Sequence, residues 1–392
     1  MGQVRDTNLP RTPVTGMFVV ASALVAVALP FFMVGGLAVQ IRAELGLNEA
    51  TFGAGVTVGF LVGAMSAPIC GRVADRIGAR PTIYLGCAIS VAALAGLGLL
   101  TNGFAALVGF LCIGGVGIAL TDPGLAILVS RGIPTHRQGL AFGVKEASIP
   151  AAALVAGLAV PAIALTVGWR WAFLTGVIPV AVVLIGLPRM SMSPDPPRAV
   201  PDPAAGAGSP PNRNALFLVA LAAALGTTAG SGAGIFLTGS AVAMGMSPGN
   251  AGLLLATGSL AGIVARVTTG MVADRSGGPQ FRLIAAMLAG GALAMALGGT
   301  GNTALLVLAT IGAFTGGWAW TGIYFLSLVR TSPHRPGAVA GIGSAGLGLG
   351  NAAGPLLFGL VAGSVSYAAA WLGAALVAGL ASILMTVARK RF

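Results

Sequence analysis

The chain has 392 residues, of which 56% are apolar and 8% are charged, and its formal net charge is +12. Soluble domains carry about 25% charged residues, so the composition excludes a soluble enzyme. Disordered chains are charge-rich and apolar-poor, and they are excluded as well. A nucleic-acid-binding protein gathers basic residues on one soluble face, whereas here they stand in short clusters between apolar runs. We therefore expect a multi-pass protein of the lipid bilayer that binds no nucleic acid.

A spanning helix needs about 20 mostly apolar residues, and such runs occur along the whole chain. In chain order the twelve runs are 17–40, 50–70, 82–100, 104–129, 139–166, 171–188, 215–238, 249–270, 282–299, 303–329, 338–362 and 368–388. The long polar stretch from Ser191 to Arg213 separates runs six and seven. This pattern predicts an all-α membrane protein with an N-terminal six-helix half (1–190), a cytoplasmic linker (191–213) and a C-terminal six-helix half (214–392).

The basic residues predict the orientation of the chain. With the N-terminus in the cytoplasm, 18 of the 21 Lys and Arg residues lie on the cytoplasmic side, only Arg42 and Arg170 lie outside, and Lys145 lies within a span. Cytoplasmic loops carry such an excess of positive charge, so both termini are expected in the cytoplasm. The Arg-, Ala- and Gly-rich composition is typical of a bacterium with a GC-rich genome, which would place the chain in the plasma (inner) membrane.

The two predicted halves repeat one loop motif. The stretch from Gly71 to Gly78, with Asp75 and Arg76, recurs 199 residues later with Gly270, Asp274 and Arg275. The dipeptide His136-Arg137 recurs as His334-Arg335 before the fifth and eleventh spans. Both halves begin on the same side, so the repeat is parallel, as in the two halves of one large class of transporters.

These features resemble the major facilitator superfamily. Its signature for this loop is G-x-x-x-D-R-x-G-[RK]-[RK], which Gly71, Asp75, Arg76, Gly78 and Arg80 match and from which Ala79 departs. The resemblance implies two pseudo-symmetric halves around a central cavity lined by spans 1, 4, 7 and 10. It also implies that Asp75 caps the positive N-terminal end of the eleventh span and so latches the cytoplasmic gate. The alternative is a charged turn that only enforces the orientation.

Charged residues inside the predicted spans indicate a site for substrate or protons. Asp122 lies roughly 13 Å deep, at about 1.5 Å per residue from the helix end, and a turn near Pro134 brings Lys145 and Glu146 to the same level. We expect Asp122 to pair with Lys145 and Glu146 to face water or the cavity. Two carboxylates beside one lysine can share one titratable proton. The alternatives are a purely structural ion pair or an interfacial position for Lys145 and Glu146.

Aromatic residues are weaker candidates for the site. The Trp residues at positions 169, 171 and 371 fall at extracellular helix ends, as an aromatic belt predicts. Trp318 and Trp320 fall mid-span, so with Tyr324 they either face a central cavity or fill the core. Phe31 and Phe32 of the first span are further candidates. Arg266, one turn before Gly270, is expected to extend to the cytoplasmic surface and to be structural.

The resulting prediction is a monomeric secondary active transporter that moves a small organic solute by alternating access with a proton as coupling ion. No nucleotide-binding loop is present, and Cys70, Cys87 and Cys112 form neither a disulfide framework nor a zinc motif. We therefore expect no enzyme activity, cofactor or metal. An intramembrane enzyme is the alternative from another class, and a transport-silent sensor is a third. A flux assay in liposomes separates the three.

Overall fold

The computed structural model describes residues 13–132, 138–190, 213–276, 278–331 and 336–391. Within these ranges twelve helices are long and apolar enough to cross a membrane, so the predicted number of spans is confirmed. The predicted linker 191–213, except Arg213, and the residues His136, Arg137, His334 and Arg335 lie outside the described part of the chain.

The first half contains spans one to six and a short helix at one end of the bundle. Its helices are α1 (Pro13–Gly36), α2 (Ala38–Leu45), α3 (Glu49–Ile77), α4 (Ala79–Leu99), α5 (Phe104–Gly132), α6 (Gln138–Ala159), α7 (Trp169–Ala172) and α8 (Val177–Gly186). A π-helical turn, Val160–Ala164, extends α6. A tight turn of 3₁₀ helix, Phe173–Gly176, joins α7 to α8 within the sixth span.

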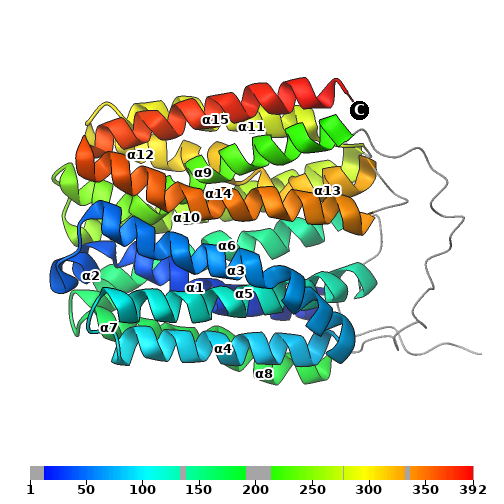
Figure 1. The fold of residues 1–392 in the computed structure, drawn as a ribbon, viewed down its shortest axis with the longest axis horizontal. Coiled ribbons are helices and arrows are strands. Elements are labelled where there is room, and N and C mark those ends of the chain that lie inside the picture. Colours follow the sequence, from blue (N-terminus) through cyan, green and yellow to red (C-terminus); the bar gives the residue numbers. More distant parts are fainter. Residues whose placement is uncertain (1–12, 133–137, 191–212, 277, 332–335, 392) are drawn as a thin grey trace, which may run out of the picture.

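The second half contains spans seven to twelve. Its helices are α9 (Arg213–Ala243), α10 (Pro248–Ser276), α11 (Phe281–Gly298), α12 (Thr303–Gly312), α13 (Thr321–Thr331), α14 (Pro336–Ser364) and α15 (Tyr367–Arg389). A π-helical turn, Ala313–Trp318, joins α12 to α13 within the tenth span. Figure 1 shows α9 to α15 stacked above the helices of the first half, with the C-terminus at the right-hand end.

Two helix pairs hold the halves together, α6 against α10 and α3 against α14. We call the end that carries the α3–α4 and α10–α11 loops and the C-terminus the motif end, and the other the opposite end. At the opposite end α3 and α14 are in close contact, because a Cβ on Gly53 would lie 2.3 Å from the Pro355 carbonyl oxygen. Nearer the motif end, the corresponding positions at Gly71 and Gly341 have open space around them.

Glycine residues allow α6 and α10 to pack backbone to backbone. A Cβ on Gly157 would lie 2.6 Å from the Gly252 carbonyl oxygen and 2.7 Å from the Ala256 nitrogen. Small residues permit such close approach in membranes, where helix association depends on van der Waals packing rather than on the hydrophobic effect. Because α6 and α10 approach so closely, a side chain on one of these helices can reach a main-chain group of the other.

This packing predicts the effect of one added methyl group. Gly157→Ala should destabilise the protein by about 1–3 kcal/mol, because the methyl group meets backbone atoms that cannot move aside. Thermal unfolding in detergent measures the change. Gly373→Ala on α15 is the matched control, since no atom lies within 4 Å of the added Cβ, and it should be neutral or slightly stabilising. Equal melting temperatures for the two variants would contradict the close contact.

Candidate functional site

Three charged side chains from α5 and α6 meet inside the bundle, as the depth argument predicts. The Lys145 ammonium lies 2.6 Å from an Asp122 carboxylate oxygen and 3.2 Å from a Glu146 carboxylate oxygen. We call these three residues the charge cluster. The expected pairing of Asp122 with Lys145 is therefore present, and Lys145 is buried within the protein.

The exposure of the two carboxylates differs from the prediction. The Glu146 side chain is only 7% exposed, whereas the Asp122 side chain is 48% exposed. Glu146 therefore does not face water, one of the two surroundings expected for it, because α6 packs closely against α10. Asp122 is therefore the member of the charge cluster that is accessible, and Glu146 is the enclosed one.

A fourth charge, Arg266 of α10, reaches the charge cluster from the other half. It is 1% exposed, so the expectation that it extends to the surface is wrong. Its guanidinium donates hydrogen bonds to the main-chain carbonyls of Glu146, at 2.8 Å, and Trp318, at 3.0 Å. Among the described residues no carboxylate lies within 4.0 Å of it. Arg266 therefore bridges the two halves through backbone oxygens.

Both carbonyls lack a backbone donor from their own helix, although the Trp318 carbonyl also accepts a hydrogen bond from the Thr321 hydroxyl at 3.3 Å. Pro150 lies within α6 and has no N–H to donate to the Glu146 carbonyl four residues earlier. Trp318 ends the π-helical turn, and the amides of Gly322 and Ile323 donate instead to Ala319 and Trp320. An unsatisfied carbonyl in a membrane costs several kcal/mol, which makes each of them a strong acceptor for a buried guanidinium.

The mid-span aromatic residues divide into two groups. Trp318 lies beneath Arg266, with the guanidinium carbon 5.3 Å from the ring centroid, and it contacts Phe32 of α1 at 5.6 Å between centroids. Trp320 and Tyr324 are fully buried and pack edge to face. Phe31 is fully buried as well and stacks on Phe60.

Of these aromatic residues, Trp318 therefore contacts Arg266 and Phe32 contacts Trp318, while Trp320, Tyr324 and Phe31 form core. Of the three Trp residues expected in an aromatic belt, Trp171 is exposed, whereas Trp169 and Trp371 are buried within the protein. Trp169 donates a hydrogen bond to a Glu44 carboxylate oxygen at 2.6 Å, a contact that gave no signal in the sequence.

At the motif end, the second copy of the loop motif connects the two halves. The Asp274 carboxylate accepts hydrogen bonds from the amides of Gly139, at 2.7 Å, and Leu140, at 2.9 Å. These amides belong to the first turn of α6, where N–H groups have no partner within the helix. Asp274 thus caps a helix of the opposite half. Asp75, for which this contact was predicted with the eleventh span, is exposed and makes no hydrogen bond to the described residues.

The opposite end is closed by a network that the sequence analysis did not identify. Arg42 forms an ion pair with Glu49 and donates a hydrogen bond to the Tyr367 hydroxyl at 2.9 Å. That hydroxyl donates to Glu49 at 3.1 Å. Tyr367 begins α15, so this network joins the second half to the first.

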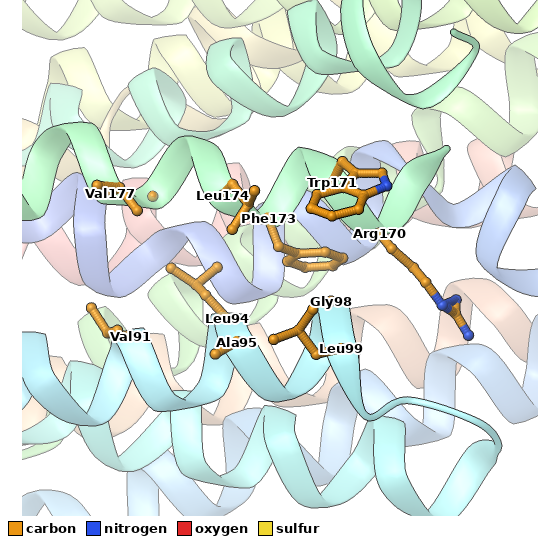
Figure 2. Close-up of a pocket in the computed structure, with 11 residues that line it drawn as sticks. Val91, Leu94, Ala95, Gly98, Leu99, Arg170, Trp171, Phe173, Leu174 and Val177 are labelled. Atoms are coloured by element: carbon orange, nitrogen blue, oxygen red, sulfur yellow. The ribbon is translucent and has the colours of Figure 1, made fainter. Parts of the chain in front are cut away.

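The structure also contains a cavity of about 220 Å³ away from the charge cluster. It lies between α4 and the sixth span, with Val91 and Leu94 on one side and Trp171 and Val177 on the other (Figure 2). Arg170 at its edge is already bound to Glu44 at 3.0 Å and to the Thr101 carbonyl at 2.7 Å. The lining is apolar, so this cavity is not the candidate transport site.

The comparisons with known proteins identify the family. The sequence model of the Major Facilitator Superfamily matches residues 20–297, so the chain belongs to this family of membrane transporters. Its fold also matches the crystal structure of a bacterial homologue of the human lysosomal transporter Spinster, described as inward-facing and occupied. The TM-score is 0.71 at 15% identity, over 96% of each chain.

Three bacterial relatives match part of the sequence. The MFS-type transporter Rv1250 of Mycobacterium tuberculosis, described as uncharacterized, is 32% identical over 43% of this chain. The glucose transporter GlcP of Staphylococcus epidermidis is 29% identical over 41%, and the transporter YycB of Bacillus subtilis, also uncharacterized, is 30% identical over 40%. The matches cover 27%, 36% and 39% of those proteins. The chain is thus a multi-pass membrane protein with bacterial homologues.

The burial of Glu146 predicts which partner of Lys145 dominates stability. Lys145→Ala should cost about 3–5 kcal/mol, as expected when one member of a buried ion pair is removed. Adding Glu146→Gln should restore more of this loss than adding Asp122→Asn, because water can solvate the half-exposed Asp122. Denaturation of the purified variants measures the difference. A larger rescue by Asp122→Asn would show that Asp122 is the buried partner.

Proposed function

We propose that the protein is a secondary active transporter that moves a small organic solute by alternating access and couples this movement to protons. The observation that carries the proposal is the charge cluster of Asp122, Lys145 and Glu146 inside the bundle, joined by Arg266. Ionisable residues at membrane depth are costly and mark ion or substrate pathways. Midplane sites between the two halves are typical of this class of transporter.

The proposed orientation follows from the distribution of positive charge. With the motif end in the cytoplasm, the excess of Lys and Arg lies inside, as in other membrane proteins. The chain is then a monomer of the bacterial plasma (inner) membrane with both termini in the cytoplasm. Residues 1–190 and 214–392 are the two moving halves, and residues 191–213 are their cytoplasmic linker.

The contacts at the two ends support alternating access. The network of Arg42, Glu49 and Tyr367 closes the opposite end, which is extracellular in the proposed orientation. Asp274 caps α6, whereas Asp75 has no comparable contact. We assign this structure to a state closed to the outside, and we propose that Asp75 caps the start of α14 when the cytoplasmic end closes.

Three chemical classes of solute are candidates. Lys145 favours an anion, while Trp318 favours an aromatic or cationic molecule through its ring face. Among the relatives, one is named a glucose transporter, which adds a neutral sugar to the classes worth testing. No observation favours the intramembrane enzyme or the silent sensor.

The test is flux in proteoliposomes under an imposed pH gradient. Thermal shifts with a metabolite and drug panel that includes D-glucose, benzoate and tetraphenylphosphonium select the probe, and an internal pH-sensitive dye then reports proton movement when that probe is added. We expect accumulation that depends on the pH gradient and stops when an ionophore dissipates it. Flux without proton movement would retain the transporter and reject the proton coupling. No flux with any solute would reject the transporter itself.

The charge cluster predicts a separation of coupled transport from exchange. Glu146→Gln should abolish accumulation driven by a pH gradient but leave solute exchange, because exchange needs no net proton movement. The glutamine keeps the shape of the side chain while removing its titratable proton. Arg330→Gln, which alters a guanidinium that bonds the Ala273 and Gly278 carbonyls within one half, is the matched control. Full pH-driven accumulation by Glu146→Gln would place the proton site elsewhere.

The two copies of the loop motif predict opposite effects on the conformational balance. Asp75→Asn should weaken the outward-facing state by about 0.3–1 kcal/mol, since an amide interacts less strongly with a helix N-terminus than a carboxylate does. Asp274→Asn should instead weaken the contact seen here between α10 and α6. Accessibility of single cysteines at the two ends measures the balance. If Asp75→Asn leaves it unchanged, Asp75 serves only to set the orientation.

A further inference from the structure

Arg266 brings a second positive charge to the charge cluster from the other half of the protein. With both carboxylates ionised, Asp122 and Glu146 balance Lys145 and Arg266, so the four groups are together neutral. Without Arg266, two acids and one base would leave one carboxylate in surplus. The bridge from Arg266 to the Glu146 carbonyl therefore crosses the contact between the halves and also completes the charge balance.

The other elements around these four groups add little charge. Among the described residues, α1 carries no ionisable side chain, and α9 carries only Arg213 at its first position. From α13, Tyr324 is buried, and Arg330 lies in the last turn, where its guanidinium donates hydrogen bonds to the Ala273 and Gly278 carbonyls. Asp274 of α10 lies two turns further along the helix and is engaged with the first turn of α6. The protonation of Glu146 therefore decides whether the four groups are together neutral or positive.

We infer that Arg266 is a positioning residue that couples the protonation of Glu146 to the contact between the two halves. The inference rests on the proposed proton coupling. When Glu146 takes up a proton, Arg266 and Lys145 share one negative charge, and an excess positive charge is left in a dry interface. A buried charge without compensation is strongly destabilising. Separation of α6 from α10 lets water reach Arg266 and removes that destabilisation.

The hydrogen bonds of Arg266 link the protonation of Glu146 to the separation of α6 from α10. Its guanidinium holds the Glu146 carbonyl of the first half and the Trp318 carbonyl of the second half at once. If α6 moves away from α10, Arg266 loses one of these bonds unless water replaces the lost acceptor. Protonation, hydration of Arg266 and separation of the halves therefore occur together.

The test measures the distance between the halves as a function of pH, with no solute present. Spin labels are placed on cysteines introduced at Phe142 of α6, which is half-buried, and Met271 of α10, which is exposed, both near the motif end. Cys70, Cys87 and Cys112 are replaced by alanine. In this background the distance should be short at high pH and longer at low pH.

The charge balance predicts a distinct response for each variant. Glu146→Gln leaves an excess positive charge and should give the long distance at every pH. Arg266→Gln leaves an excess negative charge when Glu146 is ionised, so the response should invert, with the long distance at high pH. The double variant is neutral again and should give the short distance at every pH. Arg266→Lys keeps the charge and should keep the direction of the original response.

Two results would overturn the inference. One is a Glu146→Gln variant whose distance follows pH as in the parent protein. The other is a double variant with a distance as long as that of Glu146→Gln, which would give Arg266 a purely structural role. Arg330→Gln, the control within one half, should respond as the parent does. If Arg266→Gln fails to fold, Arg266→Lys and the two Glu146 variants decide. The distances are measured without transport, so either of these results, in a protein that shows pH-driven flux in a separate assay, would refute this inference and leave the proposed function intact.

Discussion

A backbone carbonyl inside a bilayer must find a donor in the protein, and this constraint explains the central contacts of the structure. Pro150 and the π-helical turn in the tenth span each leave a carbonyl without its backbone donor. Arg266 donates a hydrogen bond to each of these two carbonyls. The same solution recurs elsewhere. Pro30 frees the carbonyl of Ala26, which accepts a hydrogen bond from Ser90 at 2.8 Å. At each of these positions a break in the helical hydrogen bonds occurs together with a donor side chain from another helix. Removing the donor side chain would take a hydrogen bond away from the carbonyl that it contacts.

This constraint also explains how four charges can lie together at membrane depth. Each buried ion must be paired or hydrogen-bonded to offset its desolvation. Lys145 contacts two carboxylates, and Arg266 is held by two carbonyls and lies against the Trp318 ring. The arrangement draws on both halves of the fold, so the stability of the charges depends on how the halves meet. A site of this kind responds to the relative position of the halves without any moving loop.

Much of this architecture could be predicted from the sequence, because the signals are local. Hydropathy gave the twelve spans, and counting residues from a helix end placed Asp122 level with Lys145. Arg266 was misjudged because its position one turn before Gly270 suits a side chain that reaches the surface. Its burial depends on the packing of α6 against α10, which no local pattern encodes. The same reason applies to Trp169 and Trp371, which stand at helix ends as belt residues do but are covered by neighbouring helices. The π-helical turn likewise has no periodic signal.

The glycine-lined contact between α6 and α10 has a mechanical consequence. Helices with large side chains interlock as ridges in grooves, and displacing one past the other requires many side chains to change rotamer. Here main-chain atoms of Gly157 and Gly252, and again of Gly143 and Gly270, meet with almost no side chain between them. Such a surface is smooth, so one helix can slide or turn against the other in small steps with few steric barriers. The α6–α10 contact therefore has few interlocked side chains that would resist a shift or a separation of the two helices.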